Sequence, residues 1–375
     1  MTKKELVINY QFLFSISFNF IIRCEMIRNK IKALTACFLL AILIIVILTV
    51  SGNNQKPNGF NRELLTDAID KMNEFDIKYN SFYIAGMTSN QIFLGNFTSP
   101  LYLLELNQSL SDTHQINIIN PGNTRYRVTH ITVDSPNIFV ADEVRYGIIQ
   151  GPLNNFRMHI YRADGGFFAD AIPISQISCI VRTMKPNTKE AVLVKEIKEK
   201  ETTIKKFGDN ILQKQVDGWF CTDGLINYSP ELGRLVYLYI YRNQFLCIDT
   251  NLNLIYKGKT IDTCTQAKLS VGKINSENSI TITSKPFLVN KKSCLAGELL
   301  FVNSNLKADN ENRKRFLHSS VIDVYDIKDG KYRFSFYIPD YGRYKIRYFR
   351  VSGNTLVAEY EHTLVTYNLN SKYFR

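Results

Sequence analysis

Short apolar runs alternate with polar turns over most of this chain. In RLVYLYIYRNQFLCIDTNLNLIYKG, which begins at Arg234, the apolar run Leu235 to Tyr241 is followed by Arg-Asn-Gln and then by a second run from Phe245 to Ile248. Seven apolar residues are too few to span a bilayer. Tyrosine and β-branched residues bounded by Asn and Asp are typical of strands joined by tight turns. The stretch therefore predicts three short strands.

A similar phrase occurs four times along the chain. Each copy has a strand-like run, a short polar side chain and a polar turn; the polar side chains are Glu105, Asp249, Asp326 and Asn368. Glu105 and Asp249 are 144 residues apart, which is close to three units of about 48 residues, a spacing typical of propeller blades. Asp249 and Asp326 are 77 residues apart, so we expect an insertion in the polar segment NSNLKADNENRKRFLHSS.

The aromatic content supports an all-β body without a linker. The chain has 24 Phe, 21 Tyr and one Trp, and the region 79–375 contains no Pro/Ser/Gly-rich boundary. A closed β-architecture accommodates this length as one domain. We therefore predict an all-β fold, a β-propeller of about six blades. Seven blades are the alternative count, and a pair of β-sandwiches is the alternative fold.

The N-terminal region has a different composition. Arg28, Lys30 and Lys32 precede an uncharged, mainly apolar run over 33–52, which is long enough to cross a membrane. Positive charge before the run predicts a cytoplasmic N-terminus and an extracytoplasmic body. We therefore predict a single-pass signal anchor in a bacterial inner membrane, with the body in the periplasm; a cleaved signal peptide is the alternative. Residues 1–32 are then a cytoplasmic tail, or the true start is Met26.

A helix is predicted between this anchor and the strands. Apolar residues recur at helical spacing in FNRELLTDAIDKMNEFDIKY, namely Leu64, Leu65, Ala68, Ile69, Met72 and Phe75. We therefore interpret 53–78 as a linker followed by a short amphipathic helix. The propeller-like extracytoplasmic domain would then occupy 79–375. Because the last repeat supplies only three strands, we expect SFYIAGM, near Ser81, to complete the final blade and close the ring.

Charge and motifs exclude several kinds of function. The net charge of +12 is spread over the chain, whereas a nucleic-acid-binding protein needs a concentrated basic stripe, so no nucleic-acid partner is predicted. Five cysteines follow the anchor without forming C-x-x-C, and their disulfide pairing is left open. The sequence contains no G-x-S-x-G, H-E-x-x-H or phosphate-loop motif. We therefore predict no catalytic residue, no metal and no cofactor.

The alternative function is that of an enzyme. A propeller hydrolase or lyase would use carboxylates at the channel mouth, and the candidates are Asp134, Asp142, Asp217 and Asp223. Asp217 and Asp223 each precede a glycine, so both also fit simple turns. Three or more of these carboxylates converging at one opening would favour the enzyme.

Several segments resemble a family of uncharacterised, membrane-anchored bacterial envelope proteins with a propeller-like body. The segments are YNSFYIAG, QIFLGNFTSPLYLLEL, KQVDGWFCTDGLINY, LVYLYIYRNQFLCIDT and LVAEYEHTLVTYNL. The resemblance covers most of 79–375 and supplies no catalytic residues. It implies a partner in the envelope, namely a membrane protein of the methylamine-utilisation redox type.

These observations predict a membrane-tethered binding or scaffold module whose partner is another membrane or envelope protein. Aromatic and arginine side chains dominate the energetics of protein interfaces. The residues expected to contact the partner are Trp219, Phe220, Tyr228, Tyr241, Arg343 and Arg347.

Overall fold

The computed structural model describes residues 28, 30–47, 57–122, 125–162, 166–200, 202–274 and 279–374. The chain divides into two compact units, Met1–Pro57 and Asn58–Arg375. In the first unit, a helix from Lys30 to Ile47 is long and apolar enough to cross a membrane, judged by length and composition. This helix confirms the apolar N-terminal helix predicted from the sequence.

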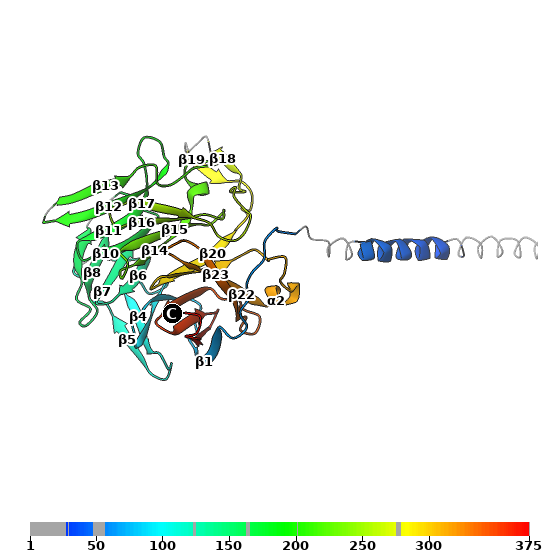
Figure 1. Cartoon of the computed structure of the whole chain (residues 1–375), viewed down its shortest axis with the longest axis horizontal. Helices are drawn as coiled ribbons and strands as arrows, with labels where there is room; N and C mark the ends of the chain where they lie inside the picture. The colour runs from blue at the N-terminus through cyan, green and yellow to red at the C-terminus, as the bar shows by residue number, and fades with distance from the viewer. Residues whose placement is uncertain are drawn as a thin grey trace, which may run out of the picture. The chain divides into compact units, whose positions relative to one another are not determined.

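The second unit is a six-bladed β-propeller, as predicted (Figure 1). Each blade is a four-stranded antiparallel sheet. Blade 1 consists of β2 (Phe82–Met87), β3 (Gln91–Asn96), β4 (Tyr102–Asn107) and β5 (Thr113–Asn117). Blade 2 consists of β6 (Thr129–Asp134), β7 (Asn137–Asp142), β8 (Ile148–Pro152) and β9 (His159–Arg162). Blade 3 consists of β10 (Asp170–Ser175), β11 (Ser178–Met184), β12 (Ala191–Glu199) and β13 (Thr202–Gly208).

The last three blades carry the insertions of the fold. Blade 4 consists of β14 (Gly224–Ser229), β15 (Arg234–Tyr239), β16 (Phe245–Asp249) and β17 (Leu254–Gly258). Blade 5 consists of β20 (Asn290–Ala296), β21 (Leu299–Ser304), β22 (Ser319–Asp326) and β23 (Tyr332–Pro339). Blade 6 consists of β24 (Tyr348–Ser352), β25 (Thr355–Glu359) and β26 (Thr363–Leu369), together with β1 (Ile69–Asp76). A separate hairpin, β18 (Val271–Ile274) with β19 (Ser279–Ile282), lies between blades 4 and 5. A short helix, α2 (Arg313–Leu317), lies between β21 and β22.

The first strand of each blade is its inner strand. β2 packs against both β6 and β24, and β20 packs against both β14 and β24. These contacts set the inner strands side by side around a central channel. The inner strands β6 and β10 do not pack closely against each other, and a cleft opens between their blades.

The ring is closed by β1, which pairs antiparallel with β26, from Ile69 opposite Leu369 to Asp76 opposite Thr363. The predicted amphipathic helix is therefore wrong. The register shifts between Lys71 and Glu74, and such a bulge breaks the two-residue alternation of a strand. The resulting spacing of apolar residues imitated a helix, while the free edge of β26 favours a strand. SFYIAGM does not close the ring, because it forms β2 of blade 1.

The repeated phrases of the sequence all fall on the third strand of a blade. They form β4, β16, β22 and β26, so the interval from Glu105 to Asp249 does span three blades. The interval from Asp249 to Asp326 spans one blade and exceeds the length of a blade because it contains two insertions, one around β18 and β19 and one around α2. The strand β24 begins at Tyr348, after a turn in which Tyr341 and Tyr344 exchange backbone hydrogen bonds.

Candidate functional site

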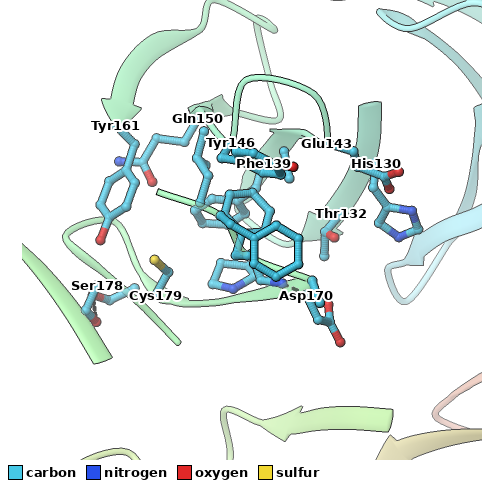
Figure 2. Close-up of a pocket in the computed structure, with 18 residues that line it drawn as sticks. His130, Thr132, Phe139, Glu143, Tyr146, Gln150, Tyr161, Asp170, Ser178 and Cys179 are labelled. Atoms are coloured by element: carbon cyan, nitrogen blue, oxygen red, sulfur yellow. Dashed lines mark hydrogen bonds between the residues drawn. The ribbon is translucent and has the colours of Figure 1, made fainter. Parts of the chain in front are cut away.

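A cleft of about 360 Å³ lies between blades 2 and 3 (Figure 2). Ligand sites in proteins typically occupy about 300 to 1,000 Å³. One wall comes from β6, β7, β8 and β9, and the other from β10, β11 and the segment 167–169 that precedes them. The cleft is therefore large enough for a small organic molecule.

The local folding of blade 2 shapes the rim of the cleft. Asp142 ends β7 and accepts hydrogen bonds from the backbone N–H groups of Val144 and Arg145, each at 2.9 Å. This cap turns the chain so that Glu143 and Tyr146 line the cleft. Tyr146 has φ of 58°, a left-handed conformation that non-glycine residues seldom adopt.

Aromatic side chains from both blades form the apolar wall. The ring of Tyr146 meets Phe167 edge-on, with centroids 5.4 Å apart, and Phe168 in the same way at 5.7 Å. Phe167 also contacts Trp219 at 5.5 Å. The guanidinium of Arg182 lies 4.3 Å from the centroid of the Trp219 ring. Trp219 thus supports the wall from behind without lining the cleft.

Gln150 supplies an unpaired acceptor to the cleft. It lies on β8 and is only 4% exposed. Its Nε2 donates to the carbonyl of Gln176 and lies 3.1 Å from Nε2 of His159, whereas Oε1 has no hydrogen-bond partner. A buried acceptor without a partner is costly and uncommon. Its position in the lining of the cleft points to a ligand that donates to it.

The imidazole of His130 and the carboxyl of Asp170 lie at the end of the cleft away from Gln150. Figure 2 shows Gln150, Tyr161, Ser178 and Cys179 at one end, and His130, Thr132 and Asp170 at the other. Burial raises the pKa of Asp170 to about 6, although the hydrogen bond from the backbone N–H of Ala171 and the charge of Arg182 act against this rise. Burial also raises the pKa of Glu143.

His130 and Cys179 are poorly suited to reaction at neutral pH. Burial, assisted by Arg350 and Lys292, lowers the pKa of His130 to about 4, so its ring is neutral. That ring stacks on Tyr83 with centroids 4.7 Å apart. Burial raises the pKa of Cys179 to about 12, and the thiolate is the nucleophilic form. The arrangement is suited to binding a polar group.

The structure brings three of the predicted partner-contacting residues together. Trp219 and Phe220 are half-buried at the short 3₁₀ turn η1 (Phe220–Thr222), and Tyr241 is buried against Cys221. Trp219 is the member of this group that adjoins the cleft, through Phe167.

The other three predicted residues lie elsewhere. Tyr228, on β14, lines a cavity of about 80 Å³ on the central channel, together with Asp134 and Arg350. Arg343 is exposed in the turn before β24, whereas Arg347 is half-buried and donates to the carbonyl of Asn80 at 2.6 Å. Binding of a partner by the six residues stays a prediction.

The four carboxylates of the alternative enzyme do not form one site. Asp142 pairs with Thr129 and Asp134 with Asn137, so the two carboxylates lie at opposite ends of the β6–β7 hairpin. Asp217 accepts the backbone N–H groups that begin η1, as expected for a turn. Asp223 forms an ion pair with Arg182 at 2.8 Å. Among the residues described, no group of three or more His, Cys, Asp or Glu could hold a metal ion.

Sequence reasoning missed the cleft itself. Its walls come from two blades, and no local motif marks a gap between blades. One signal was available: Gln150 interrupts the buried apolar strand Ile148–Pro152, and a polar residue there needs a reason.

Comparison with known proteins supports the fold alone. No known family profile matches the sequence, and no curated protein matches it. The structure is similar to a member of the DUF4221 family from Bacteroides vulgatus, with a TM-score of 0.50, 12% identity, and coverage of 84% of this chain and 99% of that one. Membership of the envelope family that the sequence resembles therefore stays a prediction.

Two further structures are less similar. One is described as a candidate exported protein from Bacteroides fragilis, with a TM-score of 0.46, 10% identity, and coverage of 84% of this chain and 95% of that one. The other is regucalcin, a calcium-binding protein from Agrobacterium tumefaciens, with a TM-score of 0.42, 11% identity, and coverage of 82% and 95%.

Proposed function

We propose that this chain is a membrane-tethered binding protein of the bacterial envelope, and that the cleft between blades 2 and 3 is its ligand site. The observation that carries the proposal is Oε1 of Gln150, a buried acceptor without a partner in a cavity of ligand size. A bound donor would satisfy this atom and remove the penalty of its burial. The aromatic wall would bury the apolar part of the same ligand.

The tether rests on the N-terminal helix. The helix Lys30–Ile47 has the length and composition of a membrane span, and Arg28, Lys30 and Lys32 lie at its N-terminal end. Basic residues are retained on the cytoplasmic side, so the propeller would lie outside the cytoplasm. A tethered domain meets proteins of the same membrane at high local concentration, which supports the envelope partner predicted from the sequence.

The binding proposal is tested by blocking the cleft. Ala169 is exposed and lines the cleft, so Ala169→Trp would fill it without disturbing the core. Ser109→Trp, in the exposed β4–β5 turn of blade 1, is the matched control. Both full-length variants and the parent chain would be placed in lipid nanodiscs, incubated with small molecules extracted from the envelope, and examined by native mass spectrometry.

The parent and Ser109→Trp should retain a bound adduct that Ala169→Trp loses, while all three keep the same melting temperature. An adduct retained by Ala169→Trp would place the ligand outside the cleft. A parent chain without any adduct would refute the binding proposal.

A further inference from the structure

Two side chains that line the cleft offer hydrogen-bond acceptors with unused capacity. Oε1 of Gln150 has no donor. The carboxyl of Asp170 accepts only the backbone N–H of Ala171, at 2.8 Å, which leaves most of its lone pairs unused. The hydroxyl of Tyr161 is already committed, because it donates to the carbonyl of Glu196 at 3.1 Å. A complementary ligand must therefore bring donors.

The charges that line the cleft have one sign. Asp170 and Glu143 are acidic, and no lysine or arginine is among the lining residues that the structure describes. Two guanidinium groups lie behind the wall and are engaged: Arg182 pairs with Asp223 at 2.8 Å and stacks on Trp219. Arg162 pairs with Glu196 at 2.9 Å and lies over the ring of Phe168. An anionic ligand would be repelled by the two carboxylates that line the cleft, whereas a cation would be attracted to them.

The aromatic wall favours the same sign of charge. Tyr146 and Phe167, whose rings meet edge to face, line the same cleft as Glu143. Aromatic faces attract cations through their quadrupole, typically by about 0.5 to 2 kcal/mol. Carboxylates beside aromatic rings therefore form a surface suited to an organic ammonium group.

The ends of the cleft are chemically distinct. Asp170 and His130 lie at one end and Gln150 at the other, with Phe139 between them (Figure 2). A ligand that satisfied both ends would be elongated. It would carry its charge near Asp170 and a neutral donor near Gln150.

Resting on the proposed function, we infer that the cleft takes a primary ammonium compound. Its cationic head lies beside Asp170 and Glu143, its apolar body lies against the aromatic wall, and a second donor reaches Oε1 of Gln150. Binding forms an ion pair and two hydrogen bonds and involves no covalent step.

Four probes of nearly equal shape test this inference. Tyramine has an ammonium head, an aromatic body and a phenolic donor; tyrosol replaces the head by a hydroxyl; 4-hydroxyphenylacetate replaces it by a carboxylate; and phenethylamine lacks the phenolic donor. Their affinities for the full chain in nanodiscs would be measured by calorimetry at pH 7.5. Tyramine should bind at least about tenfold more tightly than tyrosol or 4-hydroxyphenylacetate, and more tightly than phenethylamine.

Variants assign the two ends of the ligand. Asp170→Asn keeps the shape of the side chain and should reduce tyramine binding to the level of tyrosol. Asp112→Asn, in an exposed turn of blade 1, should change nothing. Tyramine binding that survives Asp170→Asn would overturn the inference, and so would equal or tighter binding of 4-hydroxyphenylacetate.

The two proposals fail in different ways. If tyrosol or 4-hydroxyphenylacetate binds best and Ala169→Trp abolishes that binding, the cleft is a ligand site and only the inferred ammonium is wrong. If none of the four probes binds, the inference is also wrong. The experiment with the envelope extract then tests separately whether the cleft binds any small molecule.

Discussion

Arg62 donates from Nε to Oδ1 of Asp323 over 2.6 Å, and both side chains are buried. The same guanidinium contacts Oε2 of Glu311 at 2.5 Å. Burial alone would lower the pKa of Arg62, but Asp323 and Glu311 more than offset it and the pKa rises. The segment ahead of β1 is thereby fixed to blade 5, beside the bridge of Leu64 to Ser335.

Replacing Arg62 by alanine should destabilise the propeller strongly. Removing one partner of a buried ion pair leaves the other charges uncompensated, which typically costs about 3 to 5 kcal/mol. The free energy of unfolding in urea measures this loss. Lys71→Ala is the control, because its pair with Glu74 is exposed to solvent and exposed ion pairs add little to stability. Equal effects of the two variants would contradict a structural role for the buried pair.

Ring closure by β1 predicts that the strand can be supplied separately. A chain that begins at Lys78 would leave the edge of β26 unpaired and lose the contacts of Arg62. Its melting temperature should fall and it should aggregate, since free strand edges pair with other chains. A synthetic peptide of residues 58–77 added in trans should restore solubility by rebuilding the edge. An unchanged melting temperature in the shortened chain would show that closure does not depend on β1.

The sequence predicted the blades better than it predicted how they join. The third strands repeat because each carries a buried run and an Asx-type turn within ten residues, as at Asp249, which caps its own turn through Asn251 and Asn253. Local chemistry of this kind can be predicted from a single sequence. The strand β1 could not be predicted in this way, because residues 69–76 form a strand only by pairing with β26, which lies far away in the chain.

The cleft shows the same limit. Asp170 and Gln150 lie on different blades, and their chemistry arises from the gap between those blades. The polar residues that stand out in the sequence, Asp142 and Asp217, proved to cap turns. Isolated Asp-Gly and Asp-rich segments satisfy backbone donors more often than they build sites.

The proposed topology predicts opposite labelling of two introduced cysteines. Ser109→Cys lies in an exposed turn of the propeller and Arg28→Cys at the start of the apolar helix. In cells with a permeabilised outer layer, a membrane-impermeant maleimide should label the first and not the second. After lysis it should label both. Labelling is scored against the parent chain, and the reverse pattern would refute export of the propeller.

Glu359 predicts a pH-dependent weakness of the fold. The side chain is fully buried on β25, and the backbone N–H of Ile84 is the hydrogen-bonding group that acts on its carboxyl group. Burial raises its pKa to about 8, although Arg347, 3.8 Å away, and Lys292 act against this rise. Tyr348 also lies near this carboxyl group. At pH values between the unfolded pKa of about 4.3 and about 8, the folded chain therefore holds a proton that the unfolded chain releases.

This proton contributes stability that is fully present below the unfolded pKa and is lost as the pH rises toward 8. Glu359→Gln, which carries no titrating proton, should therefore gain stability over the parent chain as the pH rises from 5 to 8. The expected gain is on the order of a few kcal/mol. Urea unfolding at both pH values measures it, with the exposed neighbour Glu361→Gln as the control. A stability difference between Glu359→Gln and the parent that stays constant with pH would show that Glu359 is already ionised in the folded chain.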